Sequence, residues 1–361
     1  MSRLRLLPAD VWNDESIPLG EDRSLKLAVS ESYSGMTIRI PVFIRRGASN
    51  GPAMFVTAAI HGDELNGTGA VRELIMREDM RPHSGTLILV PVVNILGFDR
   101  HQRYLPDRRD LNRCFPGSRT GSLASRLART IFQQIVSRCD YGIDLHTAAV
   151  RRTNYPNVRA DVRDERVQRF AEAFGSEVIL KSSGPDGSFR REACAAGCPT
   201  IVLEAGEVWK VEPTVVECAV RGVRNAMIHF GMISGMPQKP AFQVTLEKTK
   251  WVRSEKGGFL QFHVAPGDVV REGAPLATSS SLVGEERSTM VAPFAGLVLG
   301  MTTLPATSPG EPVCHLGRLD DNIEEIELLR RRSSSQSLDN RVRGDLATGV
   351  MVTDPTSNAV R

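Results

Sequence analysis

The sequence has neither an excess of charge of one sign nor a long apolar run. Its 45 Lys and Arg residues nearly balance 42 Asp and Glu residues, which leaves a net charge of +3 over 361 residues. Nucleic-acid binding requires basic groups that neutralise phosphates, so we expect no nucleic-acid partner and a small substrate instead. The longest apolar stretch, residues 87–93, is far shorter than the roughly 20 residues that span a bilayer, so no membrane partner is expected.

Cysteines are few, and a targeting signal is not apparent. Of the six cysteines, the one close pair is Cys194 and Cys198, whose spacing suits neither a zinc ribbon nor a redox CxxC motif. We therefore expect reduced thiols. Pro8 and acidic residues interrupt the N-terminal segment before the apolar part of a signal peptide can form, so a cytoplasmic location is the default expectation.

The apolar pattern of the first two thirds of the chain predicts an α/β protein. Alternation between Leu25 and Phe43 predicts two half-buried strands of a hairpin, within an N-terminal part that covers residues 1–50. Over residues 51–236, short apolar runs alternate with helical stretches, which predicts a catalytic domain with strands buried on both faces. Helices are expected over residues 123–135, 161–174 and 213–230, the first of them capped by Ser122.

The last third of the chain differs from the rest in composition and periodicity. Residues 237–318 are punctuated by Gly, Pro and Val without a helical period, which predicts a small all-β, barrel-like domain. Residues 319–361 are polar and rich in Ser and Arg, and we expect this tail to be largely disordered.

Two strand ends carry residues that can bind a metal ion. An apolar strand ends at Ile60 and is followed by His61 and Glu64, whose spacing allows both side chains to coordinate one ion. A second apolar strand ends in His146. Ligands gather beyond the carboxyl ends of strands in open α/β sheets, so these residues can form one site with two His and one Glu ligand, the set found in catalytic zinc sites.

Asp144 precedes His146 by two residues and therefore points to the same side of its strand. It either orients an imidazole or is satisfied by backbone N–H groups, and the sequence favours neither role.

Two further sequence segments carry polar residues that are candidates for substrate binding and proton transfer. A Gly- and Pro-rich loop places Asn112 and Arg113 in a turn-prone segment, where a guanidinium can bind a substrate carboxylate through two hydrogen bonds. Another buried strand ends in Glu204, which can exchange a proton with water and a leaving amine, with Glu207 as the competing choice.

Four motifs in this order, HGDE, RYLPDRRDLNR, DLHT and VLEAGE, resemble the succinylglutamate desuccinylase and aspartoacylase family, relatives of the zinc carboxypeptidases. The resemblance covers roughly residues 50–318 and implies a mixed, mostly parallel sheet flanked by helices. It implies the following roles: one Zn²⁺ per subunit held by His61, Glu64 and His146, Glu204 as general base and acid, Asn112 and Arg113 on the substrate carboxylate, and Arg103 on the scissile carbonyl. The family has HGNE where this chain has HGDE, and Arg108 is a rival for the carbonyl role.

Residues 258–298 resemble the hammerhead domain that carries lipoyl or biotinyl groups. Such a carrier needs a lysine at its hairpin tip, and none lies between Thr278 and Met290, so no attached cofactor is expected. In this resemblance the β unit caps the active-site mouth or packs against another subunit of a possible homo-oligomer.

The sequence therefore predicts a zinc-dependent amidohydrolase that deacylates a small N-acyl amino acid with a carboxylate. Two alternatives stay open: a metallocarboxypeptidase that acts on short peptides, and a non-catalytic binding module that retains the fold. Among the other histidines, which are expected to be structural or exposed, His101 stands out because it lies among the loop arginines. Trp209 and Tyr155 either line the pocket or pack.

Overall fold

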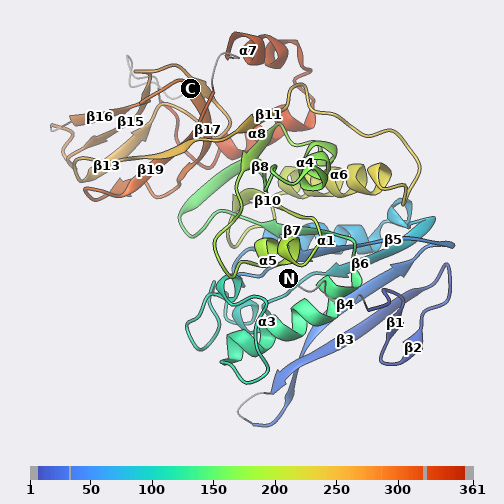
Figure 1. Cartoon of the computed structure of the whole chain (residues 1–361). Helices are drawn as coiled ribbons and strands as arrows, with labels where there is room; N and C mark the ends of the chain where they lie inside the picture. Colours follow the sequence, from blue (N-terminus) through green and yellow to red (C-terminus); the bar gives the residue numbers. More distant parts are fainter. Residues whose placement is uncertain (1–6, 32–33, 286, 320–322, 354–361) are drawn as a thin grey trace.

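The computed structural model describes residues 7–31, 34–285, 287–319 and 323–353. Most of its strands belong to one 13-stranded mixed sheet (Figure 1). These strands are β3 (Asp22–Glu31), β4 (Thr37–Arg46), β5 (Ser49–Ala58), β6 (Ser84–Val90), β7 (Tyr141–His146), β8 (Arg152–Ala160), β9 (Val178–Lys181), β10 (Thr200–Glu207), β11 (Val244–Leu246), β12 (Thr249–Arg253), β14 (Val269–Val270), β17 (Gly296–Thr302) and β19 (Pro312–Arg318). Their main order is β12-β19-β17-β8-β10-β7-β5-β6-β4-β3, with β9 beside β8, β11 beside β9 and β14 beside β17.

The centre of this sheet is parallel and buried. Strands β6, β5, β7 and β10 run in the same direction, and β6 and β7 are almost entirely buried along their length. Helices cover both faces of such a strand, so nearly all of its residues are apolar. This explains the near-continuous apolar runs in the sequence. The predicted α/β class with a mixed, mostly parallel sheet is confirmed. The predicted N-terminal hairpin is also confirmed, since β3 and β4 pair in antiparallel register.

Helices cover both faces of the sheet. They are α1 (Leu65–Met76), α2 (Ile95–Phe98), α3 (Leu123–Gln134), α4 (Glu165–Phe174), α5 (Phe189–Ala195), α6 (Pro213–His229), α7 (Ile323–Arg332) and α8 (Leu338–Ala347), with short 3₁₀ turns at Glu78–Met80, Leu111–Arg113 and Val136–Arg138. The apolar faces of α1, α4 and α6 belong to one core cluster, and those of α3 and α5 belong to a second.

The three predicted helices are present. Ser122 caps α3, because its hydroxyl oxygen accepts a hydrogen bond from the backbone N–H of Ser125 at 3.3 Å. Helix α6 begins at Pro213, where the missing N–H costs nothing. Helix α4 begins later than predicted, at Glu165, because the side chain of Asp164 caps it.

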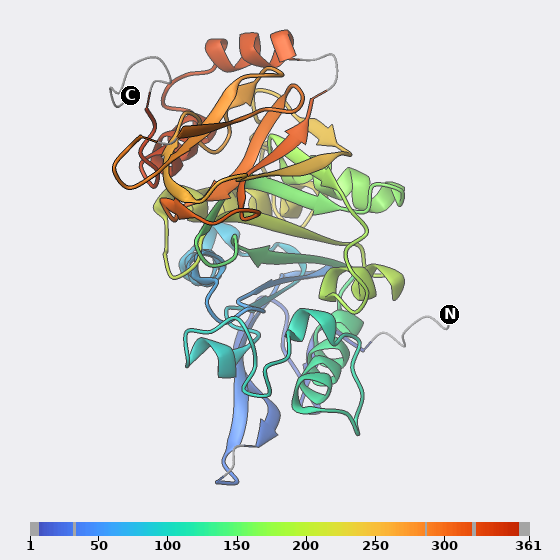
Figure 2. The same ribbon diagram turned by 90° about the vertical axis from the view of Figure 1, so that its left-hand side faces the viewer.

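The C-terminal β unit has its own core but is joined to the main sheet. A separate antiparallel sheet consists of β13 (Gly258–Phe262), β15 (Pro275–Ser280), β16 (Arg287–Val291) and β18 (Ala306–Thr307), while a small hairpin pairs β1 (Val11–Trp12) with β2 (Glu15–Ser16). Strand β17 pairs with β8, so backbone hydrogen bonds continue from the central sheet into this unit. The unit and the hairpin of β3 and β4 lie at opposite ends of the molecule (Figure 2). The predicted domain boundaries stay a prediction.

The prediction of a largely disordered tail over residues 319–361 is wrong for its described part. Helices α7 and α8 form there, and Ser337 caps α8. Val342 and Leu346 are buried in the core cluster that also contains α6. Leu338, Val342 and Leu346 recur every fourth residue along α8, but the rest of the segment is polar, and this composition favours disorder over a helix. Arg341 and Arg343 of the same helix form ion pairs with Glu217 and Glu177.

The six cysteines are free thiols, as expected, and all of them lie in the described part of the chain. Burial raises the pKa of the Cys314 thiol to about 12 and that of Cys218 to about 11, so both are protonated at neutral pH. Within the described residues, no helix combines the length and apolarity that a membrane crossing requires.

The docking of α8 can be tested at the buried pair of Arg343 and Glu177, whose Nη1 and Oε2 atoms lie 2.7 Å apart. Replacing Arg343→Met leaves the Glu177 carboxylate buried without its cation, and we expect a loss of about 3 kcal/mol in the free energy of unfolding. The matched control is Arg341→Met in the same helix, because Arg341 pairs with Glu217 at the exposed surface and should contribute less than about 1 kcal/mol. Equal losses in urea unfolding would contradict a docked helix.

Candidate metal centre and active site

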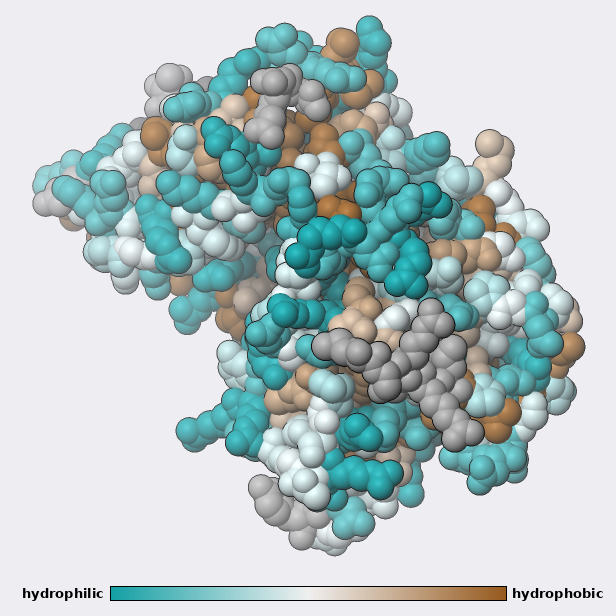
Figure 3. Space-filling view, in the orientation of Figure 1, coloured by the Kyte–Doolittle hydropathy of each residue, from teal (hydrophilic) through white to brown (hydrophobic). Residues whose placement is uncertain are grey.

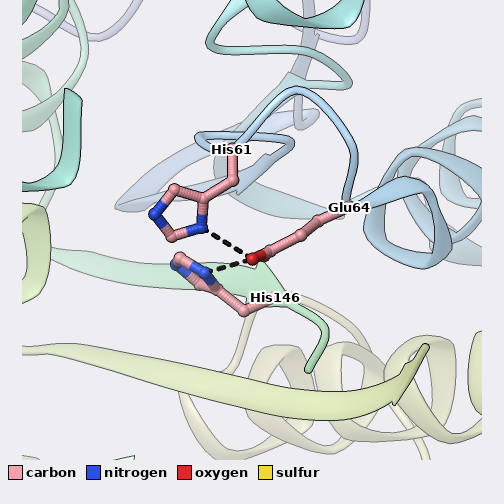
Figure 4. Close-up of side chains that lie close together, drawn as sticks. All are labelled: His61, Glu64 and His146. Carbon is pink, nitrogen blue, oxygen red and sulfur yellow. Dashed lines mark hydrogen bonds and ion pairs between the residues drawn. The ribbon is translucent and has the colours of Figure 1, made fainter. Parts of the chain in front are cut away.

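Three predicted metal ligands meet beyond the carboxyl ends of neighbouring parallel strands. His61 lies in the loop after β5, Glu64 directly precedes α1, and His146 is the last residue of β7. Both imidazoles point toward the Glu64 carboxylate (Figure 4). Strands β5 and β7 are paired in register, so the loop after one strand lies beside the end of the other.

The donor atoms of the three residues converge and are buried. His61 Nδ1 lies 2.7 Å from Glu64 Oε1, and His146 Nδ1 lies 3.0 Å from Glu64 Oε2. One donor atom from each residue lies within 4.8 Å of the others. The backbone N–H of Thr147 donates to Glu64 Oε2 at 3.1 Å, which holds the carboxylate in place.

The charges of these groups are strongly coupled. Burial raises the pKa of Glu64, but the two neighbouring imidazoles outweigh burial and hold this pKa far below its usual range. Burial lowers the pKa of His146, but the carboxylates of Asp144 and Glu64 outweigh burial and raise this pKa well above its usual value. An anionic carboxylate that faces two imidazole nitrogens in a water-poor space is a set of donors suited to a divalent cation.

A carboxylate lies close to the outer nitrogen of each imidazole. Asp144 Oδ2 lies 2.8 Å from His146 Nε2, and its other oxygen accepts a hydrogen bond from the hydroxyl of Thr57 at 2.7 Å. Asp110 Oδ1 lies 3.3 Å from His61 Nε2. Metal-binding histidines usually have such a partner, which sets the tautomer and the ring orientation. The residues therefore fit a divalent metal ion, and Asp144 takes the orienting position of its two possible roles.

Asp110 is a residue that the sequence motifs did not single out. Its other oxygen lies 3.5 Å from Arg103 Nη2. Asp110 therefore connects His61 with Arg103. Its acidic side chain sits two residues before Asn112, but nothing in that spacing indicates contact with His61.

The structure places the two rival arginines differently. Arg103 lines the cavity beside the metal cluster, and its Nη1 lies 3.1 Å from Glu64 Oε1. Arg108 is exposed in a turn with a positive φ of 62° and does not line this cavity. Of the two, only Arg103 lies beside His61, Glu64 and His146.

Glu204 lies beside the ligands on the neighbouring strand. Strands β10 and β7 are parallel, and Glu204 is directly opposite His146 in their register. Its carboxylate accepts a hydrogen bond from Asn154 Nδ2 at 3.1 Å and lies 3.4 Å from Arg159 Nη1. The competing candidate, Glu207, is outside the cavity lining and is bound to Thr303 and Lys210.

The structure does not bring Asn112 and Arg113 into the cavity. Asn112 Oδ1 accepts a hydrogen bond from the backbone N–H of Phe189, at the start of α5. Arg113 is exposed, and its guanidinium donates to the backbone carbonyl of Asn112 at 2.7 Å. Their binding of a substrate carboxylate therefore stays a prediction that this conformation does not support.

The ligands, Arg103 and Glu204 line a cavity of about 410 Å³. The C-terminal unit supplies part of its wall through Trp251 and His315. The sequence predicts that His315 is structural or exposed, but it lines the cavity. No motif of the site lies near it in the sequence, so the sequence contains no signal of this position. The surface seen in Figure 3 is mostly hydrophilic, and its outline is hollowed below the C-terminal unit.

The remaining candidates lie outside this lining. His101 is exposed, and its backbone carbonyl accepts a hydrogen bond from the indole N–H of Trp209 at 3.2 Å. Tyr155 is buried and donates to Glu177 at 2.6 Å, so it packs rather than lines the site.

Two His side chains and one Glu side chain beyond the ends of parallel strands are the set of residues typical of catalytic metal centres in α/β proteins. The chain belongs to the succinylglutamate desuccinylase/aspartoacylase family, because residues 50–230 match the catalytic domain of that family. The family resemblance seen in the motifs is thereby confirmed.

Individual relatives agree with this assignment. The chain is 28% identical over 267 residues to an N-alpha-acetyl-L-2,4-diaminobutyric acid deacetylase of Halomonas elongata. The matched region covers 70% of this chain and 78% of the relative. A succinylglutamate desuccinylase from Silicibacter sp. has a TM-score of 0.73 at 25% identity, covering 84% of this chain and 97% of the other. A product-bound structure of the ectoine utilization protein EutE (DoeB) from Ruegeria pomeroyi has the same TM-score, sequence identity and coverage of both chains.

The orienting role of Asp144 can be tested by Asp144→Asn, which preserves the shape of the side chain and removes its charge. We expect zinc affinity to fall by about 10- to 100-fold, as for other carboxylates that hold a metal-binding histidine. Competition against a chromogenic chelator measures this change, and His101→Ala serves as a control outside the cluster. Unchanged affinity in Asp144→Asn would assign Asp144 a purely structural role.

Proposed function

We propose that this protein is a zinc-dependent deacylase that hydrolyses the amide bond of a small N-acyl amino acid. The observation that carries the proposal is the convergence of His61, Glu64 and His146 beside Glu204 in one cavity. Family membership and the deacetylase activity named for the Halomonas relative support an amide as the bond that is cleaved.

Zinc, when bound by these three side chains, supplies Lewis-acid chemistry that polarises a carbonyl and lowers the pKa of water toward about 7. Glu204 is placed to accept a proton from the attacking water and to return it to the leaving amine. Asn154 and Arg159 hold its carboxylate at the cavity wall, which keeps the proton acceptor close to the reacting groups.

Arg103 is placed to face the carbonyl oxygen on which negative charge develops. Its side chain is partly buried and already held by Glu64 and Asp110, so little reorganisation is needed when the substrate arrives. A single preorganised donor of this kind contributes about 3 to 4 kcal/mol to transition-state stabilisation.

Glu204→Gln tests the proton-transfer role. The amide cannot accept the proton, so we expect kcat to fall by about 100- to 10,000-fold while zinc content stays unchanged. Glu207→Gln is the matched control, because Glu207 is on the same strand but outside the cavity, and it should retain turnover. Normal turnover in Glu204→Gln would remove Glu204 from the mechanism.

Removal of the metal tests the proposal as a whole. We expect dialysis against a chelator to abolish hydrolysis of N-acetyl or N-succinyl amino acids, and added zinc to restore it, because the carbonyl loses its Lewis acid. Release of amino acid is measured for these compounds and for short peptides. Hydrolysis of peptides alone would indicate a metallocarboxypeptidase, and binding without turnover would indicate a binding module. Full activity after chelation would contradict any zinc mechanism.

A further inference from the structure

The cavity wall contains four cationic side chains, and three of them face carboxylates. Arg103 pairs with Glu64 and Asp110, Arg159 with Glu204, and Lys181 with Glu247. The charges of these three cations are therefore already compensated within the protein.

Arg152 is the fourth cation, and it differs from the others. It is the first residue of β8 and lines the cavity, only partly exposed to solvent. Among the residues that the structure describes, no carboxylate pairs with its guanidinium and no acceptor hydrogen-bonds to it. Its guanidinium carbon instead lies 4.9 Å from the ring centroid of Trp251.

An aromatic stack from the C-terminal unit supports this guanidinium. Trp251 on β12 and His315 on β19 are direct neighbours in antiparallel register, and their rings stack with centroids 4.7 Å apart and planes 8° from parallel. Burial, and then the charges of Arg159 and Arg152, lower the pKa of His315 to about 4. His315 is therefore uncharged at neutral pH and does not repel an incoming cation or compete for an anion.

The guanidinium of Arg152 lies over the Trp251 ring, and its N–H groups can therefore donate to a partner that enters the cavity. The stack limits its rotamers, so less entropy is lost when a partner binds. The partner that matches this planar fork is a carboxylate, which accepts two parallel hydrogen bonds. Arg113, the arginine expected to bind a carboxylate, is exposed and outside this cavity.

We propose that Arg152, held on Trp251, is the residue that binds a carboxylate of the substrate, a role that the sequence motifs assigned to Asn112 and Arg113. The inference rests on the proposed function and adds to it the residue that recognises the carboxylate. The carboxylate belongs either to the amino acid or to a dicarboxylic acyl group such as succinyl, since both offer the same planar anion.

The test compares Arg152→Ala with Arg151→Ala in the zinc-loaded full-length protein. Arg151 is the exposed neighbour of Arg152 and does not line the cavity, so its variant controls for the loss of one positive charge. For the N-acetyl or N-succinyl amino acid that wild type hydrolyses best, we expect Arg152→Ala to raise KM by about 10- to 100-fold, the range for a lost hydrogen bond to a charged group, with kcat within about twofold. A KM equal to that of Arg151→Ala would overturn the proposal.

Substrate analogues identify which carboxylate is bound. The α-carboxamide of the same substrate removes the amino-acid charge, and an acetyl group in place of succinyl removes the acyl charge. Wild type should discriminate against one of these neutral analogues, and Arg152→Ala should lose that discrimination. If the variant retains the full discrimination of wild type in both comparisons, another residue binds the carboxylate.

Two further measurements separate misfolding and failure of the proposed function from failure of this inference. Arg152→Lys keeps the charge but loses the planar fork, so its KM should lie between those of wild type and Arg152→Ala, and thermal unfolding shows whether each variant is folded. Calorimetric titration with succinate tests binding without turnover. If no compound is hydrolysed, the proposed function fails, while succinate affinity that is lower in Arg152→Ala than in Arg151→Ala still supports the carboxylate site. Equal affinities, or no binding to wild type, would overturn it.

Discussion

The active site depends on one buried carboxylate that is shared by several partners. Glu64 lies against the imidazoles of His61 and His146, the guanidinium of Arg103 and the backbone N–H of Thr147. A buried charge is costly unless it is paired and hydrogen-bonded. The loop after β5 therefore needs these partners around the Glu64 carboxylate to be stable. The same arrangement directs two ring nitrogens and a carboxylate oxygen toward one point. Local stability and the ability to hold a metal ion therefore have one structural cause.

A single continuous sheet positions both ends of the cavity. His146 lies on β7, Glu204 lies on β10, and the loop after β5 carries His61 and Glu64. Strand β8 pairs with β10 on its other side. From β8, the hydrogen-bonded order continues through β17 and β19 to β12. Strands β19 and β12 bring His315 and Trp251 to the cavity wall. Because strand register is transmitted by backbone hydrogen bonds, the distance between the reacting centre and the Arg152 wall is set by the sheet and not by flexible loops.

Much of the site was predictable because its residues follow simple local patterns. Buried strands that end in His146 or Glu204 reveal themselves by apolar runs, and the spacing of His61 and Glu64 is a short-range signal. The partners of these residues were not predictable in the same way. Asp110 and Arg159 act on His61 and Glu204 across long sequence separations, and their own neighbourhoods in the sequence are ordinary charged segments.

The sequence by itself determined the class of the fold, the starts of α3 and α6, and His61, Glu64 and His146 as candidate metal ligands, because periodicity, caps and strand ends are local signals. Only the tertiary structure decided which arginines line the cavity. Arg103, Arg152 and Arg159 line it, whereas Arg108 and Arg113 remain at the surface. It also decided that a polar C-terminal segment forms α8. In each case the outcome depends on partners far away in the chain, and the local sequence does not show which distant residues a side chain contacts.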